Sequence, residues 1–110
     1  MYIYQDLFTD EYAAQNKKKL LRKLWMNIGQ IDIYLIFLSE GEDLFDIVHA
    51  GLLKQKRYPK KDLCLLGMAQ GWESACALSG EIFSHFSECY GDISFKQALE
   101  ADKPKLFRRF

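Results

Sequence analysis

An apolar run, a glycine-containing turn and a further segment with spaced apolar positions occur twice in this chain, thirty positions apart. The first copy covers residues 33–41 and continues from Glu42, and the second covers residues 63–71 and continues from Trp72. A short apolar run bounded by glycine indicates a buried strand, and apolar residues at helical spacing indicate a helix. The hydrophobic pattern therefore predicts two strand–turn–helix units.

Ahead of the first unit, the pattern predicts a helix over residues 10–27 that ends before Gly29. Thr9 is the expected N-cap, and Asp10 and Glu11 in the first turn suit the positive end of the helix dipole. One side of this helix is expected to be buried. That side consists of Tyr12, Ala13, Leu20, Leu21, Leu24, Trp25 and Ile28.

The first unit is predicted to be a strand over residues 31–38 and a helix over residues 43–57, which Pro59 stops. The strand is apolar on both sides of its pleat, so we place it in the middle of a sheet with both faces covered. The helix is expected to bury Leu44, Phe45, Val48 and Leu52.

The second unit is predicted to be a strand over residues 62–68 and a helix over residues 73–90, with Gly91 as the C-terminal cap. A short helix over residues 95–101 follows, and Ser94 is expected to open it with a capping box. Cys64 falls inside the apolar run, where a buried, inert thiol is expected.

These elements define an α/β fold in one small domain, in the order α-β-α-β-α-α. The two strands are expected to be parallel and joined by a right-handed crossover. Because two parallel strands leave both sheet edges open, either the N-terminal residues 2–4 or a second subunit must complete the sheet. Of these alternatives we favour a homodimer.

We assign residues 1–102 to this domain and residues 103–110 to a basic and aromatic C-terminal tail. The tail combines four cations with Leu106, Phe107 and Phe110, whose apolar groups cost free energy in water. Four alternatives are open for this tail: it folds back on its own domain, docks on a partner, touches a membrane surface or frays. It is too short to anchor the protein to a membrane alone.

The glycine turns are the predicted ligand site, because ligands of open α/β sheets bind at the carboxyl ends of strands. The second turn has GxxxG spacing, which matches neither a Walker nor a dinucleotide-binding motif, and the acidic flanks disfavour phosphate. The same acids and glycines also stabilise helix N-termini and tight turns without any ligand. The predicted ligand-binding residues are Ser39, Glu40, Gly41, Glu42, Asp43, Gly67, Gln70, Gly71, Trp72 and Glu73.

Catalytic and metal-binding motifs are absent from the sequence. His85 and Cys89 are spaced i, i+4, but two ligands do not make a metal site. His49 has no serine or cysteine beside it in sequence to form a nucleophile pair. We therefore expect no metal and no cofactor, and we lean towards a protein that is not an enzyme.

All but Lys96 of the 15 lysine and arginine residues fall into three groups, although the net charge is zero. The first group lies at residues 17–23 and the third at residues 103–109. The second group is the predicted polyanion contact, but cations also suit helix C-termini, so nucleic acid is not the partner we expect. That group consists of Lys54, Lys56, Arg57, Lys60 and Lys61.

The longest apolar run is too short to span a bilayer, and the first residues do not resemble a signal peptide, so we expect a cytoplasmic protein without a membrane partner. The best interpretation is a small non-catalytic protein that acts through self-association or protein–protein interaction. The first alternative is a small-ligand-binding protein or enzyme with its site at the glycine turns. The second is weak nucleic-acid binding through the lysine and arginine clusters.

Overall fold

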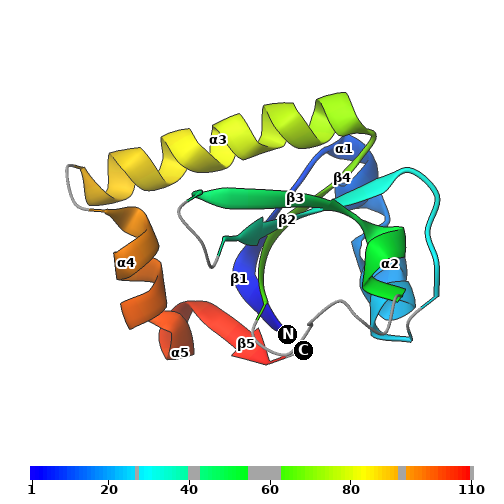
Figure 1. The fold of residues 1–110 in the computed structure, drawn as a ribbon, viewed down its shortest axis with the longest axis horizontal. Helices are drawn as coiled ribbons and strands as arrows, with labels where there is room; N and C mark the ends of the chain where they lie inside the picture. Colours follow the sequence, from blue (N-terminus) through cyan, green and yellow to red (C-terminus); the bar gives the residue numbers. More distant parts are fainter. Residues whose placement is uncertain (27, 40–42, 55–62, 92–93, 110) are drawn as a thin grey trace.

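A five-stranded mixed sheet with helices on both faces forms the centre of the molecule (Figure 1). The computed structural model describes residues 1–26, 28–39, 43–54, 63–91 and 94–109. The strand order is β3-β2-β4-β1-β5, and β1 pairs parallel with β4 while the other pairs are antiparallel. The prediction of a small α/β domain is confirmed. The strands are β1 (Tyr2–Thr9), β2 (Ile33–Leu38), β3 (Phe45–His49), β4 (Cys64–Gln70) and β5 (Phe107–Arg109).

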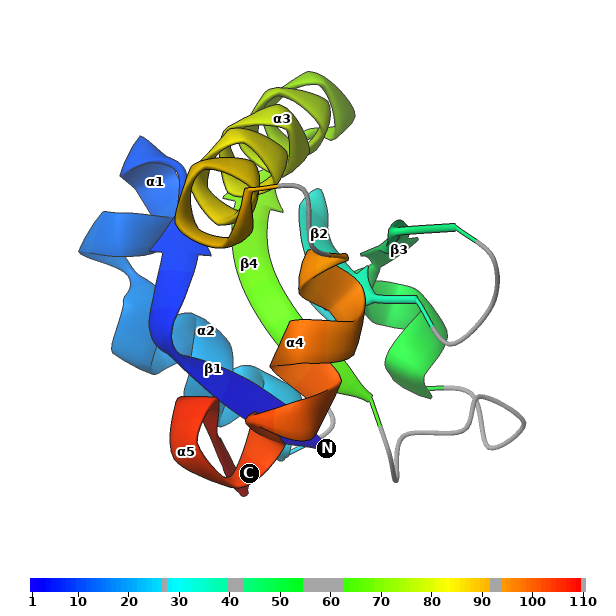
Figure 2. The same ribbon diagram turned by 90° about the vertical axis from the view of Figure 1, so that its left-hand side faces the viewer.

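Helices cover the sheet on both faces, as Figure 2 shows from the side. One face packs against α1 (Glu11–Gln15), α2 (Lys17–Trp25) and the 3-10 helix η1 (Ala50–Lys54). The opposite face packs against α3 (Trp72–Tyr90) and α4 (Phe95–Ala101). Along β2, Leu35 and Phe37 point towards α2, while Ile36 and Leu38 point towards α3. The predicted central position of this strand, covered on both faces, is therefore confirmed.

The structure corrects the predicted parallel strands and their crossover. β2 pairs antiparallel with β4, and β3 turns back antiparallel on β2 where a helix was predicted over residues 43–57. Residues 55–57 of that predicted helix lie outside the described residues. The β-branched Ile47 and Val48 favour a strand, and they pack on opposite sides of the sheet. The β2–β3 hairpin reverses the chain, and β4 runs in the same direction as β3 on the other side of β2, so β4 is antiparallel to β2.

The second predicted unit is confirmed. Its strand is β4, and its helix α3 ends at Gly91, whose φ of 60° lies in the left-handed region that favours glycine. The short helix α4 spans the predicted residues, but the Ser94 side chain makes no capping hydrogen bond to it, so the capping box is wrong. The buried position of Cys64 is also confirmed.

Both ends of the chain join the sheet. β1 completes it beside β4, and β5, which follows the short helix α5 (Lys103–Leu106), pairs antiparallel with β1. Phe107 is 4% exposed and pairs with Tyr4, so this part of the tail folds back on its own domain. The shortage of strands that led us to favour a homodimer is not found in this sheet. The homodimer itself stays a prediction.

The N-terminal helix differs from the prediction in three respects. It is two helices, α1 and α2, separated at Asn16. Asp10, rather than Thr9, is the N-cap, and its Oδ1 accepts the Ala13 N–H at 2.8 Å. Because α2 starts afresh and ends at Trp25, its buried side is set by Leu20 and Leu24. The side chains predicted to be buried but found exposed are Tyr12, Trp25 and Ile28.

Candidate functional site

The described residues on either side of the first glycine turn lie at the opposite end of the sheet from the second glycine turn. In the antiparallel β2–β4 pair, Phe37 stands opposite Leu65 and Ile33 stands opposite Gln70. The residues after β2 therefore lie near the start of β4, while the residues after β4 lie near the start of β2. The predicted site combined both turns because parallel strands were expected, and the observed topology does not bring them together.

At the first turn, the described residues close the β2–β3 hairpin. Ser39 is buried, and its N–H donates to the Leu44 carbonyl at 3.0 Å. The Asp43 carbonyl accepts a hydrogen bond from Lys96 Nζ of α4 at 2.9 Å. Glu40, Gly41 and Glu42 of the predicted ligand site lie outside the described residues.

Gly67 lies within β4, where its role is packing. A Cβ built at this position would stand 3.1 Å from the Phe8 carbonyl oxygen and 3.2 Å from Cδ1 of Ile82. Both distances are tighter than ordinary contacts, so the missing side chain lets α3 and β1 approach β4 closely. Among the predicted ligand residues, Gly67 therefore has a structural explanation.

At the second turn, backbone groups are held by two aspartates. The N–H of Gln70 donates to Oδ2 of Asp10 at 3.0 Å, and the N–H of Gly71 donates to the carbonyl of Asp32 at 2.7 Å. Gly71 has a φ of 84°, which its lack of a side chain permits. Trp72 is 53% exposed, and Glu73 is exposed in the first turn of α3.

The carboxyl ends of the parallel pair β1 and β4 do meet, and α1 and α3 begin there. A shallow depression of about 310 Å³ lies between the two helix starts. Both carboxylate oxygens of Asp10 already accept backbone N–H groups at this point. The depression is acidic and offers hydrogen-bond acceptors to a cation or an amine. Its lining residues are Thr9, Asp10, Glu11, Ser74, Ala77, Leu78 and Glu81.

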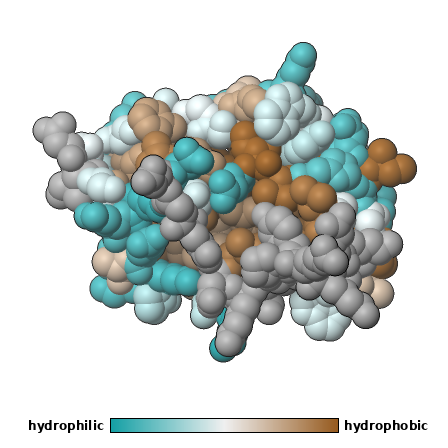
Figure 3. Space-filling view, in the orientation of Figure 1, coloured by the Kyte–Doolittle hydropathy of each residue, from teal (hydrophilic) through white to brown (hydrophobic). Residues whose placement is uncertain are grey.

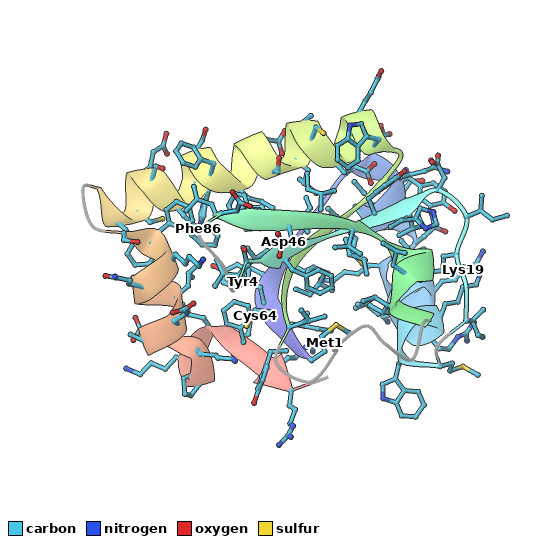
Figure 4. The ribbon with its side chains drawn as sticks, in the orientation of Figure 1. Met1, Tyr4, Lys19, Asp46, Cys64 and Phe86 are labelled. Carbon is cyan, nitrogen blue, oxygen red and sulfur yellow. The ribbon has the colours of Figure 1, made fainter. Side chains whose placement is uncertain are left out.

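Nucleophiles and metal ligands remain scattered. The Sγ of Cys89 lies 3.8 Å from Nε2 of His85 on the exposed side of α3, and Nδ1 of His49 accepts the Gly51 N–H at 3.0 Å. Within the described residues, no three His, Cys, Asp or Glu side chains gather closely enough to hold a metal ion. Figure 4 shows Tyr4 near Phe86 beneath α3, where burial raises the pKa of the Tyr4 hydroxyl and the charge of Asp6 raises it further.

Arg22 of the first basic group lines the same surface as Arg108 and Arg109 of the third. A shallow depression of about 370 Å³ separates α2 from β5, with Arg22 and Trp25 on one side and Arg108 and Arg109 on the other. Leu21 and Ile3 complete its lining. We call Arg22, Trp25, Arg108 and Arg109 the α2–β5 surface. In the second basic group, only the backbone of Lys54 is described, and Lys56, Arg57, Lys60 and Lys61 lie outside the described residues.

Large apolar side chains are exposed at the end of α2 and in the loop that follows it. Ile31 is 93% exposed and Trp25 69%, while Met26 and Ile28 are about half exposed. We call these four residues the 25–31 ridge. Ile31 and two α2 lysines, Lys19 and Lys23, line a further depression on the other side of the helix, of about 240 Å³.

Sequence reasoning missed both the α2–β5 surface and the 25–31 ridge. It treated the first and third basic groups as separate, and it assigned Trp25 to a buried face. One feature of the sequence indicated that Trp25 lies on the polar side of its helix. Lys18, Arg22 and Trp25 are spaced i, i+4, i+7 and therefore share one side of a helix.

Comparison of the chain with protein-family models, with curated proteins and with solved structures gives no match. None of the helices in the described residues has the length and apolar content needed to cross a bilayer.

Proposed function

We propose that this protein is a non-catalytic binding module that holds a polyanionic partner on the α2–β5 surface. The observation that carries this proposal is that Arg22, Trp25, Arg108 and Arg109 line one depression. Arg108 pairs with Ile3 on the face of the sheet that packs against α2. These cations come from opposite ends of the chain, and the pairing of β5 with β1 is what brings them together.

The chemistry of the surface favours anionic groups. Arginine presents a planar fork of donors that binds phosphate, sulfate or carboxylate through two hydrogen bonds at once. Arg22, Arg108 and Arg109 are all exposed, and the exposed Trp25 ring offers an apolar face beside them. Several cations on one surface also attract a polyanion from a distance, even when the net charge of the protein is zero.

Retention on heparin, a soluble polyanion, tests this proposal. Reversing three charges in R22E/R108E/R109E should abolish retention at moderate salt, because each arginine contact releases a counterion that favours binding. The salt dependence of binding should also fall by about one ion for each lost contact. The matched control is K56E/K60E/K61E, which changes the net charge equally within the basic group that the sequence alone had selected. Melting temperatures of both variants verify that each is folded.

Four results decide the outcome. Loss of retention in the arginine variant alone supports the proposal. Equal loss of retention in both variants attributes binding to net charge and contradicts the proposal. A wild-type protein that passes through the column at low salt contradicts the proposal as well. If only the lysine control loses retention, the polyanion contact belongs to the second basic group instead.

The other predictions about function stay proposals. The acidic depression at the ends of β1 and β4 keeps a small-ligand site as the alternative function, and thermal-shift screening with divalent cations and amines addresses it. The exposed, unpaired Cys76 and Cys89 support a reducing compartment, in keeping with the proposed cytoplasmic location. Self-association is addressed by size-exclusion chromatography with light scattering.

A further inference from the structure

The 25–31 ridge holds the two most exposed of the large apolar side chains in the described residues, Ile31 and Trp25, although Trp72 and Phe83 of α3 are also about half exposed. Four large apolar residues between positions 25 and 31 have between 46% and 93% of their surface in water. Exposed apolar area of this kind costs free energy and commonly marks a contact surface. Figure 3 shows apolar atoms projecting at the right-hand edge of the molecule, on the side where Figure 1 places α2.

The structure holds the most exposed of these residues outward. Gln30 and Ile33, on either side of Ile31, are only 7% and 2% exposed. The side-chain amide of Gln30 donates to the Leu20 carbonyl at 3.3 Å, and the carbonyl of Asp32 accepts the Gly71 N–H. Because the Gln30 side chain binds α2 before Ile31 and the Asp32 backbone binds Gly71 at the end of β4 after it, the Ile31 side chain remains in solvent.

Cations flank the ridge on both sides. Arg22, Arg108 and Arg109 lie on the side of Trp25, and Lys19 and Lys23 lie on the side of Ile31. The carboxylate of Asp32, the acid next to Ile31, lies beside Gly71, where a built Cβ would stand 3.7 Å from Oδ2. The ridge is therefore bordered by cations both at Trp25 and at Ile31.

We propose that the 25–31 ridge docks on the surface of an anionic lipid bilayer, with Trp25 and Ile31 among the acyl chains and the flanking cations at the headgroups. This inference rests on the proposed function, and it identifies the polyanionic partner as an anionic lipid surface. Apolar side chains bordered by cations match the boundary between acyl chains and headgroups. Neither feature alone is sufficient, because stable attachment needs apolar insertion and electrostatic attraction together.

The aliphatic residues favour a bilayer over a nucleic acid. Single-stranded nucleic acids bind through aromatic stacking and phosphate contacts, which would use Trp25 and the arginines but leave Met26, Ile28 and Ile31 in water. Acyl chains cover all four side chains. This proposal departs from our expectation of no membrane partner. That expectation rested on the lack of a spanning segment, which docking on a surface does not require.

The two tryptophans of the chain provide a direct test. In W72F, Trp25 is the only fluorophore of its kind, and we expect its emission to shift to the blue with vesicles of equal parts phosphatidylglycerol and phosphatidylcholine. In W25F, Trp72 lies in the first turn of α3 and should show no shift. Vesicles of phosphatidylcholine alone should leave both spectra unchanged, because the flanking cations then lack anionic headgroups.

Sedimentation with the same vesicles separates insertion from simple charge attraction. Ile31→Ser should weaken the binding about tenfold, whereas the control Leu44→Ser, which polarises an exposed leucine of the β2–β3 turn, should leave it unchanged. A chain that binds heparin but shows neither a blue shift nor vesicle binding overturns the lipid inference and leaves the proposed function standing. Quenching of Trp25 by a single-stranded oligonucleotide without a blue shift on vesicles assigns the surface to nucleic acid. Loss of both heparin and vesicle binding removes the proposed function as well.

Discussion

The two copies of the apolar–glycine pattern begin alike and end differently. After β2 the chain forms a second strand, β3, whereas after β4 it forms the long helix α3. The residues that follow each turn account for the difference. The first copy continues with the β-branched pair Ile47 and Val48, while the second continues with Ala75 and Ala77, which favour helices. A shared apolar run therefore predicts a strand, but it does not predict the element that follows.

The first copy also carried two patterns at once. Leu44, Phe45, Val48 and Leu52 fit a helical period, and we followed that period in predicting a helix over residues 43–57. Phe45 and Ile47 on one side, with Val48 on the other, fit the period of two that a strand requires. The short connection from β2 favours a hairpin, and in the structure the strand pattern prevails.

The largest expected difference between the copies concerns one phenylalanine in each, Phe86 on α3 and Phe45 on β3. Phe86 on α3 is 1% exposed and contacts Tyr4, Phe8 and Phe95, with ring centroids 5.6 to 5.8 Å apart. Phe86→Ala should lower the free energy of unfolding by about 3–5 kcal/mol, measured by urea denaturation. Phe45 of β3 is half-buried, so Phe45→Ala should lower the free energy of unfolding by clearly less. Equal losses at the two positions would break the comparison.

A smaller effect is expected from the close approach at Gly67. Gly67→Ala should destabilise the fold by about 1–3 kcal/mol, because the new methyl group meets the fixed Phe8 carbonyl as well as Ile82. Gly80 is the matched control, since it lies within α3 with no atom within 4 Å of a built Cβ. Gly80→Ala should raise the melting temperature, because alanine favours a helix over glycine. Destabilisation by both substitutions would contradict the packing role assigned to Gly67.

The smallest effect is expected at the end of the second copy, where Asp10 holds both α1 and the turn after β4. Asp10→Ala removes the cap of Ala13 and the acceptor for Gln70, and should cost about 1–2 kcal/mol. Thermal unfolding measures the loss, and Glu11→Gln serves as a control because Glu11 lies beside Asp10 in the first turn of α1. An unchanged melting temperature in Asp10→Ala would show that this link contributes little.

The candidate site was less predictable than the fold. The positions of lysine and arginine along the chain define three basic groups. No local pattern indicates that Arg22 of the first group lies near Arg108 and Arg109 of the third. The exposure of Ile31 was equally hidden, because an isoleucine at the start of an apolar run normally belongs to the strand. Here the strand begins two residues later, after Asp32 adopts a φ of 61°.

The sequence by itself determined the elements that rest on strong local patterns: the central strand β2, and the unit of β4 and α3 with its cap at Gly91. Each follows from hydrophobic periodicity or from the special backbone freedom of glycine, which act over a few residues. Only the tertiary structure decided that β2 and β4 are antiparallel, that β1 and β5 complete the sheet, and that Arg22, Arg108 and Arg109 share a surface with Trp25. These features depend on contacts between distant segments, because strand order and edge pairing are set by how the two faces of the sheet are buried together.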